Sequence, residues 1–112
     1  MPIQHWSEKI WIAQLGNEPT FSEDLSLLTE QFKQCESPPS VIVDLAATSL
    51  INSSQLSFLL RLRKLTIDGD TDLRLTKPSR EAWASFCLTG LDKLFLFSAD
   101  VTNALAELQM DP

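Results

Sequence analysis

Residues 41–67 read VIVDLAATSLINSSQLSFLLRLRKLTI, and this stretch indicates the fold class of the chain. It starts with VIVDL, a short and nearly continuous apolar run that is typical of a β-strand covered on both faces. A short loop then leads to residues 53–67, where leucines recur about one helical turn apart. The stretch therefore predicts a buried strand followed by a helix, which is the repeating unit of an α/β protein.

Upstream of this unit we expect two strands and one helix. Residues 9–15 (KIWIAQL) are rich in apolar and β-branched residues and predict a strand, with which a short strand around Trp6 is expected to pair. Ser22-Glu23-Asp24 opens the helix, because an acidic first turn suits the positive end of a helix dipole. One face of this helix holds the apolar residues Leu25, Leu28 and Phe32.

Downstream of the central unit, two strands alternate with two helices. The strands are predicted at residues 73–76 and 94–97, and the helices at 80–88 and 100–109, with Asp100 as the cap of the last helix. Helices that alternate with short strands predict an α/β domain with a mixed or parallel sheet. The length of 112 residues fits a single domain, residues 1–112.

The overall charge argues against two classes of partner. A formal charge of −6 repels phosphate backbones and anionic lipid, so neither nucleic-acid binding nor membrane-surface binding is expected. Membrane insertion is not expected either, because no apolar run is long enough to span a membrane. Arg61, Arg63 and Lys64 are interpreted as the solvated end of a helix. The chain has no signal-like start and no apolar run of roughly 18 residues, and its two cysteines are interpreted as reduced thiols. A soluble cytoplasmic domain is therefore expected.

The residues needed for catalysis or metal binding are missing from the pattern. His5 is the single histidine, so the chain lacks a regular set of histidine ligands for a metal. A Ser-His or Cys-His catalytic pair would have to use this same residue. With three glycines and no GxGxxG or GxxxxGK[ST] motif, the glycine-rich cradle for a phosphate is also missing. We expect no catalytic residue, no metal, no cofactor and no enzymatic activity.

The informative junction is Ser49-Leu50-Ile51-Asn52-Ser53-Ser54-Gln55, where a buried strand gives way to a helix. Loops that follow the carboxyl ends of sheet strands are where α/β folds usually place function. Asn52 or Ser53 can cap the helix by accepting a backbone hydrogen bond. An exposed serine there can also carry a phosphate beside free backbone N–H groups. From the residues alone, an ordinary cap and a phosphorylation site both stay open.

The helix after this junction carries apolar residues on more than one face. Leu56, Leu59 and Leu60 are expected in the core, which leaves Phe58 and Leu62 on a second stripe. This stripe either packs under a neighbouring helix or docks a partner. We therefore hypothesise a binding surface at the start of the helix and the adjoining loop, made of Gly16, Asn17, Thr20, Asn52, Ser53, Ser54, Gln55, Phe58 and Leu62.

Five short motifs, in order along nearly the whole chain, point to a known family. They are Leu15-Gly16, VIVDL at 41–45, NSSQL at 52–56, Arg74-Leu75 and LTGLDKLF at 88–95. With these motifs the chain resembles the STAS domain, the fold shared by anti-sigma factor antagonists and the cytoplasmic tails of sulfate transporters. The resemblance implies a four- or five-stranded mixed sheet with about four helices, mainly on one face.

The resemblance also implies a function, namely regulation by partner switching. In the antagonist branch of the bacterial family, an anti-sigma factor that is also a serine kinase phosphorylates the first serine of the motif. The unphosphorylated domain binds this kinase and the phosphorylated one releases it. By position this serine is Ser53, with Ser54 as the second candidate. Other STAS domains are unphosphorylated adaptors, including subunits of lipid-transport ATPases, so transporter ATPase or permease subunits are the alternative partners.

Four positions depart from the pattern of the antagonists. Asn52 stands where an acidic residue is usual, and Gln55 where glycine is usual. Pro19 and Thr20 stand where the family often has an acidic residue. Asparagine keeps the ability to cap a helix but removes a negative charge beside the serine. These departures weaken the expected phosphorylation switch without removing Ser53.

Overall fold

Five strands form one mixed sheet in the computed structural model, which describes residues 3–110. The strands lie in sequence order: β1 (Ile3–His5), β2 (Ile10–Gln14), β3 (Ser40–Asp44), β4 (Leu73–Thr76) and β5 (Leu96–Ser98). β1 is antiparallel to β2, whereas β2 to β5 are parallel to one another. The mixed sheet implied by the resemblance is thus confirmed, with five strands.

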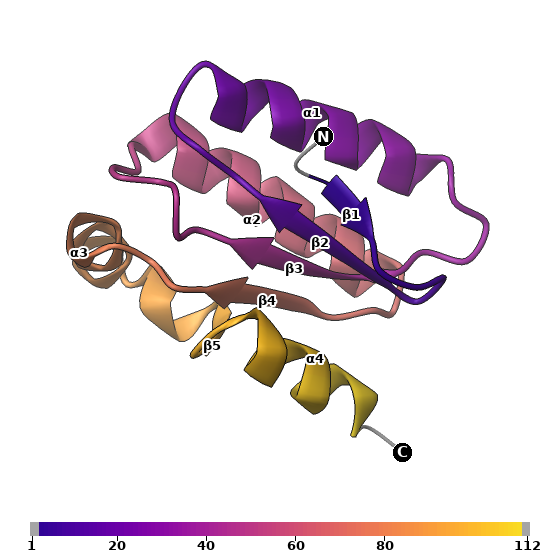
Figure 1. The fold of residues 1–112 in the computed structure, drawn as a ribbon. Helices are drawn as coiled ribbons and strands as arrows, with labels where there is room; N and C mark the ends of the chain where they lie inside the picture. Colours follow the sequence, from indigo (N-terminus) through magenta and orange to yellow (C-terminus); the bar gives the residue numbers. More distant parts are fainter. Residues whose placement is uncertain (1–2, 111–112) are drawn as a thin grey trace.

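Helices cover both faces of the sheet unequally. They are α1 (Thr20–Lys33), α2 (Ser53–Asp68), α3 (Arg80–Thr89) and α4 (Val101–Gln109), with a short 3₁₀ helix, η1 (Leu91–Lys93), between α3 and β5. Each parallel strand is added on the same side of the one before it. Because crossovers between parallel strands are right-handed, α1, α2 and α3 all lie on one face. α4 follows the last strand and folds back onto the other face (Figure 1).

The central strands are buried on both sides. In β2, Trp11 and Ala13 face the larger core under α1 to α3, whereas Ile10 and Ile12 face α4. β3 repeats the pattern with Ile42 on the side of α4. Successive side chains of a strand point to opposite faces, so a continuous apolar run is what this position requires. The prediction that VIVDL is a strand covered on both faces is confirmed.

Most predicted boundaries agree with the structure to within one residue, and three differ by more. α1 begins at Thr20, before the acidic residues, which brings Phe21 into the helix and into the core. β1 ends at His5, so Trp6 lies outside the strand. β5 begins two residues later than expected, because Gly90 ends α3 with a positive φ of 75° and residues 91–93 then form the turn of η1.

Candidate protein-binding site at the start of helix α2

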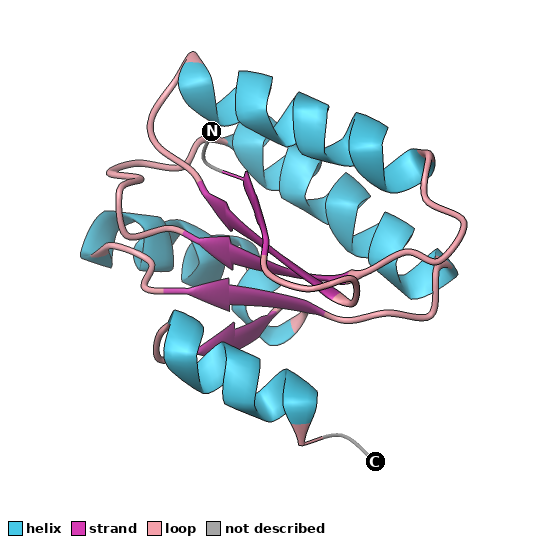
Figure 2. Cartoon of the chain, turned by 45° about the vertical axis from the view of Figure 1, so that its right-hand side comes forward, coloured by secondary structure: helices cyan, strands magenta, loops and turns pink. Residues whose placement is uncertain are grey.

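The loops after β2, β3 and β4 meet at one edge of the sheet. Parallel strands bring their carboxyl ends to the same edge, and Figure 2 shows these loops gathered there. The buried Thr48 hydroxyl donates to the Leu15 carbonyl oxygen at 2.9 Å. The Ser49 N–H donates to Asn17 Oδ1 at 2.8 Å, and Ser79 Oγ donates to the Ser49 carbonyl oxygen at 2.8 Å. The middle loop, residues 46–52, is therefore held from both sides.

Asn52 and Gln55 close the N-terminus of α2 reciprocally. The Gln55 N–H donates to Asn52 Oδ1 at 2.9 Å, and the Asn52 N–H donates to Gln55 Oε1 at 2.7 Å. This is a capping box, which satisfies two of the backbone donors that a helix start leaves without partners. The two residues that depart from the usual STAS motif thus act together as one structural device.

Ser53 and Ser54 are the first two residues of α2, and both are exposed. Helix geometry leaves their N–H groups without partners inside α2, because the first intrahelical bond runs from the Leu56 N–H to the Asn52 carbonyl oxygen. The first turn contains no acidic residue. The positive end of the helix dipole therefore faces outward beside two serine hydroxyls, a setting that accepts negative charge.

An apolar side chain stands next to these serines. Leu50 is 65% exposed, although both of its neighbours are held in place. Ser49 is hydrogen-bonded to Asn17 and Ser79, and Ile51 is buried. Leu50 borders a depression of about 550 Å³. The depression is also lined by Asn17, Ser49, Ile51, Asn52 and Gln55. Glu18 lies at the rim, but its carboxylate is engaged at α1, where it accepts hydrogen bonds from the Ser22 N–H and hydroxyl.

Six of the predicted residues are exposed or half-buried at the loop edge, and three differ from them. Gly16, Asn17 and Thr20 follow β2, and Asn52, Ser53 and Ser54 follow β3, so all six lie at the loop edge. The other three differ in burial or position, and they are Gln55, Phe58 and Leu62.

Two of these three are buried. Leu62 is fully buried in the core, so the expectation that it contacts a partner is wrong. Gln55 is only 3% exposed, because its side chain is directed back to the Asn52 N–H. Gln55 nevertheless lines the depression beside Leu50, so its contact with a partner stays a prediction. In the free protein its side chain completes the cap of α2. Phe58 is half-buried and lines a separate groove between α1 and α2.

Residues outside the predicted binding surface complete this edge. Thr48, Ser49 and Ser79 join the three loops through hydrogen bonds to residues 30 to 33 positions away in the sequence, which no local motif reveals. Leu50 had a detectable signal, because it is an apolar residue in a loop and outside any helical or strand period. Its exposure depends on the hydrogen bonds of the neighbouring loops, which the sequence does not show.

The family model for the STAS domain matches residues 14–104. No curated protein matches the sequence. Of the helices within residues 3–110, none has both the length and the apolar character needed to cross a membrane.

Solved structures with the same fold share little sequence with this chain. A Thermotoga maritima protein described as an anti-sigma factor antagonist has a TM-score of 0.81 at 15% identity, covering 96% of this chain and 93% of its own. A variant of RsbS from Moorella thermoacetica has a TM-score of 0.74 at 15% identity, with coverages of 97% and 96%. An anti-sigma factor antagonist from Mycobacterium paratuberculosis has a TM-score of 0.74 at 18% identity, with coverages of 96% and 91%.

Proposed function

The chain belongs to the STAS domain family, and from this premise we propose that it is a regulatory protein of the anti-sigma factor antagonist type. It acts by binding a protein partner, an anti-sigma factor with serine kinase activity, and not by catalysis. The observation that carries the proposal is the exposed pair Ser53 and Ser54 at the start of α2, beside the exposed Leu50.

The loop edge has the chemistry of a small protein-binding surface. Leu50 supplies apolar area, and the depression beside it accepts an apolar side chain of the partner. Asn17 and the two serines supply polar groups around this apolar centre. An apolar centre with a polar rim is the usual composition of an interface.

Phosphorylation of Ser53 would switch this surface off. A phosphate adds a charge of about −1.5 to −2, which the free N–H groups of α2 tolerate in the isolated domain. In a complex the same charge would lie in a contact from which water is excluded, and an unpaired charge there costs several kcal/mol. Because about 1.4 kcal/mol is already a tenfold change in affinity, no change of fold is required.

A second candidate function is a STAS adaptor subunit that is not phosphorylated, in a lipid-transport ATPase or another complex. The capping box favours this candidate, because Asn52 and Gln55 satisfy each other without an acidic residue or a phosphate at the helix start. The apolar contact through Leu50 is also independent of charge.

A pull-down from native lysate with the tagged protein separates the two candidates. We expect a serine kinase of the anti-sigma type among the captured proteins, with phosphate on Ser53 in part of the pool by mass spectrometry. Capture of transporter ATPase or permease subunits by a protein unmodified at Ser53 would instead establish the adaptor.

The switch itself is tested with Ser53 variants and the captured partner. Ser53→Asp is expected to weaken binding at least tenfold more than Ser53→Ala in isothermal titration calorimetry, because only the former adds charge to the contact. Ser26→Asp, on an exposed position of α1, is the matched control and should bind as the wild type does. Equal affinities of Ser53→Asp and Ser53→Ala would contradict the switch.

A further inference from the structure

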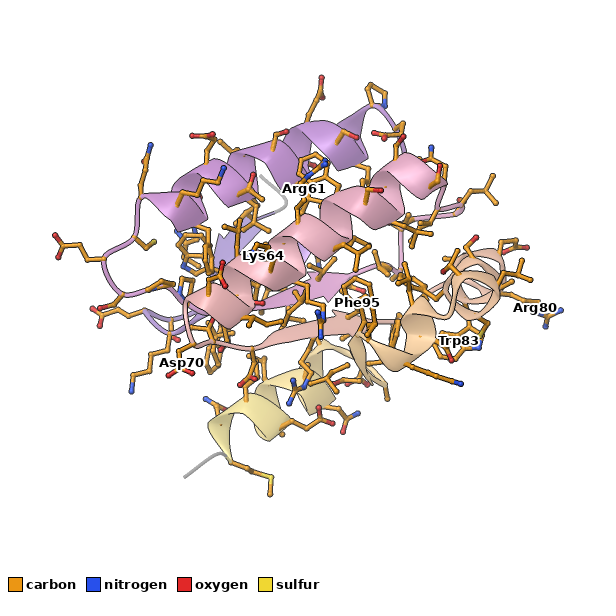
Figure 3. The ribbon with its side chains drawn as sticks, turned by 180° about the vertical axis from the view of Figure 1, so that it is seen from behind. Arg61, Lys64, Asp70, Arg80, Trp83 and Phe95 are labelled. Atoms are coloured by element: carbon orange, nitrogen blue, oxygen red, sulfur yellow. The ribbon has the colours of Figure 1, made fainter. Side chains whose placement is uncertain are left out.

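A second surface lies between α1 and α2, away from the loop edge. We call it the α1–α2 groove. It has a volume of about 380 Å³ and is lined by Thr29 and Lys33 of α1 and by Phe58, Arg61, Lys64, Leu65 and Asp68 of α2. Figure 3 shows Arg61 and Lys64 on the side of α2 that faces α1, whereas Arg80 points away from the molecule on α3.

The floor of the groove is apolar and incompletely covered. Phe58 and Leu65 are half-buried, and both pack against the main core. The guanidinium carbon of Arg61 lies 5.0 Å from the centroid of the Phe58 ring, within the range of a cation–π contact. This contact places the charged end of Arg61 over part of the apolar floor.

The rim of the groove is positive on a protein that is otherwise acidic. The groove is lined by three cationic side chains, Lys33, Arg61 and Lys64, and by one carboxylate, Asp68. Asp68 forms an ion pair with Lys64 at 3.4 Å. The whole chain has a formal charge of −6. Lys33 lies in the last turn of α1, where the helix dipole favours a cation, whereas Arg61 and Lys64 lie before the last turn of α2, which holds no basic residue. The cations of the rim thus come from two helices.

The apolar floor and the cationic rim together indicate which kind of partner would fit the groove. We propose that the α1–α2 groove docks an acidic amphipathic helix of a protein partner. Its apolar side chains would cover Phe58 and Leu65, and its carboxylates would face Lys33, Arg61 and Lys64. This is the arrangement in which an amphipathic helix binds a groove through residues spaced at i, i+3 or i+4, and i+7.

The length of the groove fits a short helix. Phe58 and Asp68 mark its ends on α2, and at 1.5 Å rise per residue they are about 15 Å apart. A partner helix of roughly three turns spans this distance. The negative charge of the rest of the protein repels the same acidic helix, which restricts it to this groove.

The groove is separate from the surface around Ser53. Arg61 is about 12 Å from Ser53 along the axis of α2, and the depression beside Leu50 shares no residue with the groove. The two surfaces can thus bind different segments of one partner or two partners at once. Loss of one interaction does not imply loss of the other.

The test uses a designed probe with the full chain. The probe is a fluorescein-labelled 16-residue peptide with capped ends, Leu at i, i+4, i+7 and i+11, and Glu on both flanks. We expect saturable binding by fluorescence anisotropy at 50 mM salt, weakened severalfold at 500 mM salt because exposed charges are screened. Amide shifts of the ¹⁵N-labelled protein are expected to change along the facing sides of α1 and α2.

Charge-reversal variants locate the binding. The double variant Arg61→Glu/Lys64→Glu is expected to lower the affinity of the protein for the probe at least tenfold. Arg80→Glu/Lys93→Glu removes the same charge from exposed positions outside the groove and should change the affinity less than twofold. Ser53→Asp should also leave the affinity unchanged, which separates this surface from the proposed switch.

Several results would overturn the proposal. One is the absence of saturable binding at 50 mM salt, and another is an equal loss in both charge-reversal variants. Tight binding of a peptide with Lys in place of Glu would remove the charge argument. Binding of decanoate or phosphatidylglycerol vesicles in place of the peptide, or self-association through this groove in sedimentation, would assign it to a different occupant.

Discussion

Asn52 and Gln55 show how two neighbouring departures from a family motif compensate each other. Asparagine supplies the cap acceptor that aspartate would supply, and glutamine returns a hydrogen bond to the Asn52 N–H. Glycine at position 55 would lack this side chain and could not complete the box. The pair therefore stabilises the helix start, where Ser53 is the first helical residue.

Removal of the cap is the first prediction at this scale. Asn52→Ala is expected to lower the free energy of unfolding by about 1 kcal/mol, because the Gln55 N–H loses its acceptor and the Gln55 side chain loses its anchor. Urea denaturation measures the change. Ser57→Ala, at an exposed position inside the same helix, should stay within about 0.5 kcal/mol of the wild type. A similar small effect of Asn52→Ala would mean that the box contributes nothing.

The burial of the different faces of α2 does not follow from its sequence. Leucines and Phe58 occur on several sides of this helix, so their spacing does not tell which side meets α1, which meets the sheet and which stays open. The structure buries Leu62 completely and leaves Phe58 half-covered in the α1–α2 groove. Only the position of α1 decides this difference.

At the scale of elements, α4 is the one helix that packs alone on its face of the sheet. Ala104 is fully buried there, in a small core with Ile10, Ile12 and Ile42. A small residue lets the helix backbone approach the sheet closely. Arg74 and Ser98 add polar contacts to Glu107 of α4, at 3.4 and 2.6 Å.

The close approach of α4 predicts a strong dependence on side-chain size. Ala104→Leu is expected to destabilise the protein by about 1–3 kcal/mol, because the added atoms have no space between α4 and the sheet. Ala106→Leu, at an exposed position of the same helix, should change the stability by no more than about 0.5 kcal/mol. Thermal unfolding followed by circular dichroism compares the two. Equal stabilities would show that α4 is loosely packed.

At the scale of the whole molecule, the candidate site depends on three loops that are distant in sequence. Thr48 is the buried connection between two of them, because its hydroxyl lies within hydrogen-bonding distance of the carbonyl oxygens of both Leu15 and Gly16. Ser49 extends the connection to Asn17 and Ser79. The position of Leu50 and Ser53 relative to the Asn17 loop follows from these bonds.

Loss of this connection should affect stability and binding together. Thr48→Val keeps the shape of the side chain but removes the donor, and we expect a loss of about 1–3 kcal/mol from the buried carbonyl groups left unpaired. Affinity for the captured partner should also fall, because the loops are no longer held in register. Thr102→Val, exposed on α4, is the control for both measurements. A destabilised variant with unchanged affinity would show that the loops bind independently.

The sequence alone determined the fold class, the order of the elements and the position of Ser53 at a helix start. These properties depend on local patterns: the period of apolar residues, turn residues and cap residues, which act within a few positions of one another. The five motifs of the STAS family added the sheet and the general class of function. Errors at this level were limited to element ends, such as the start of β5 after Gly90.

Tertiary structure alone decided which side chains are available at the surface. The burial of Gln55 and Leu62, the exposure of Leu50 and the groove between α1 and α2 all result from contacts between segments far apart in the chain. The same holds for the three loops joined through Thr48 and Ser49. A periodic pattern states that a face is apolar, but burial depends on which other element covers it, and this is a property of the folded chain.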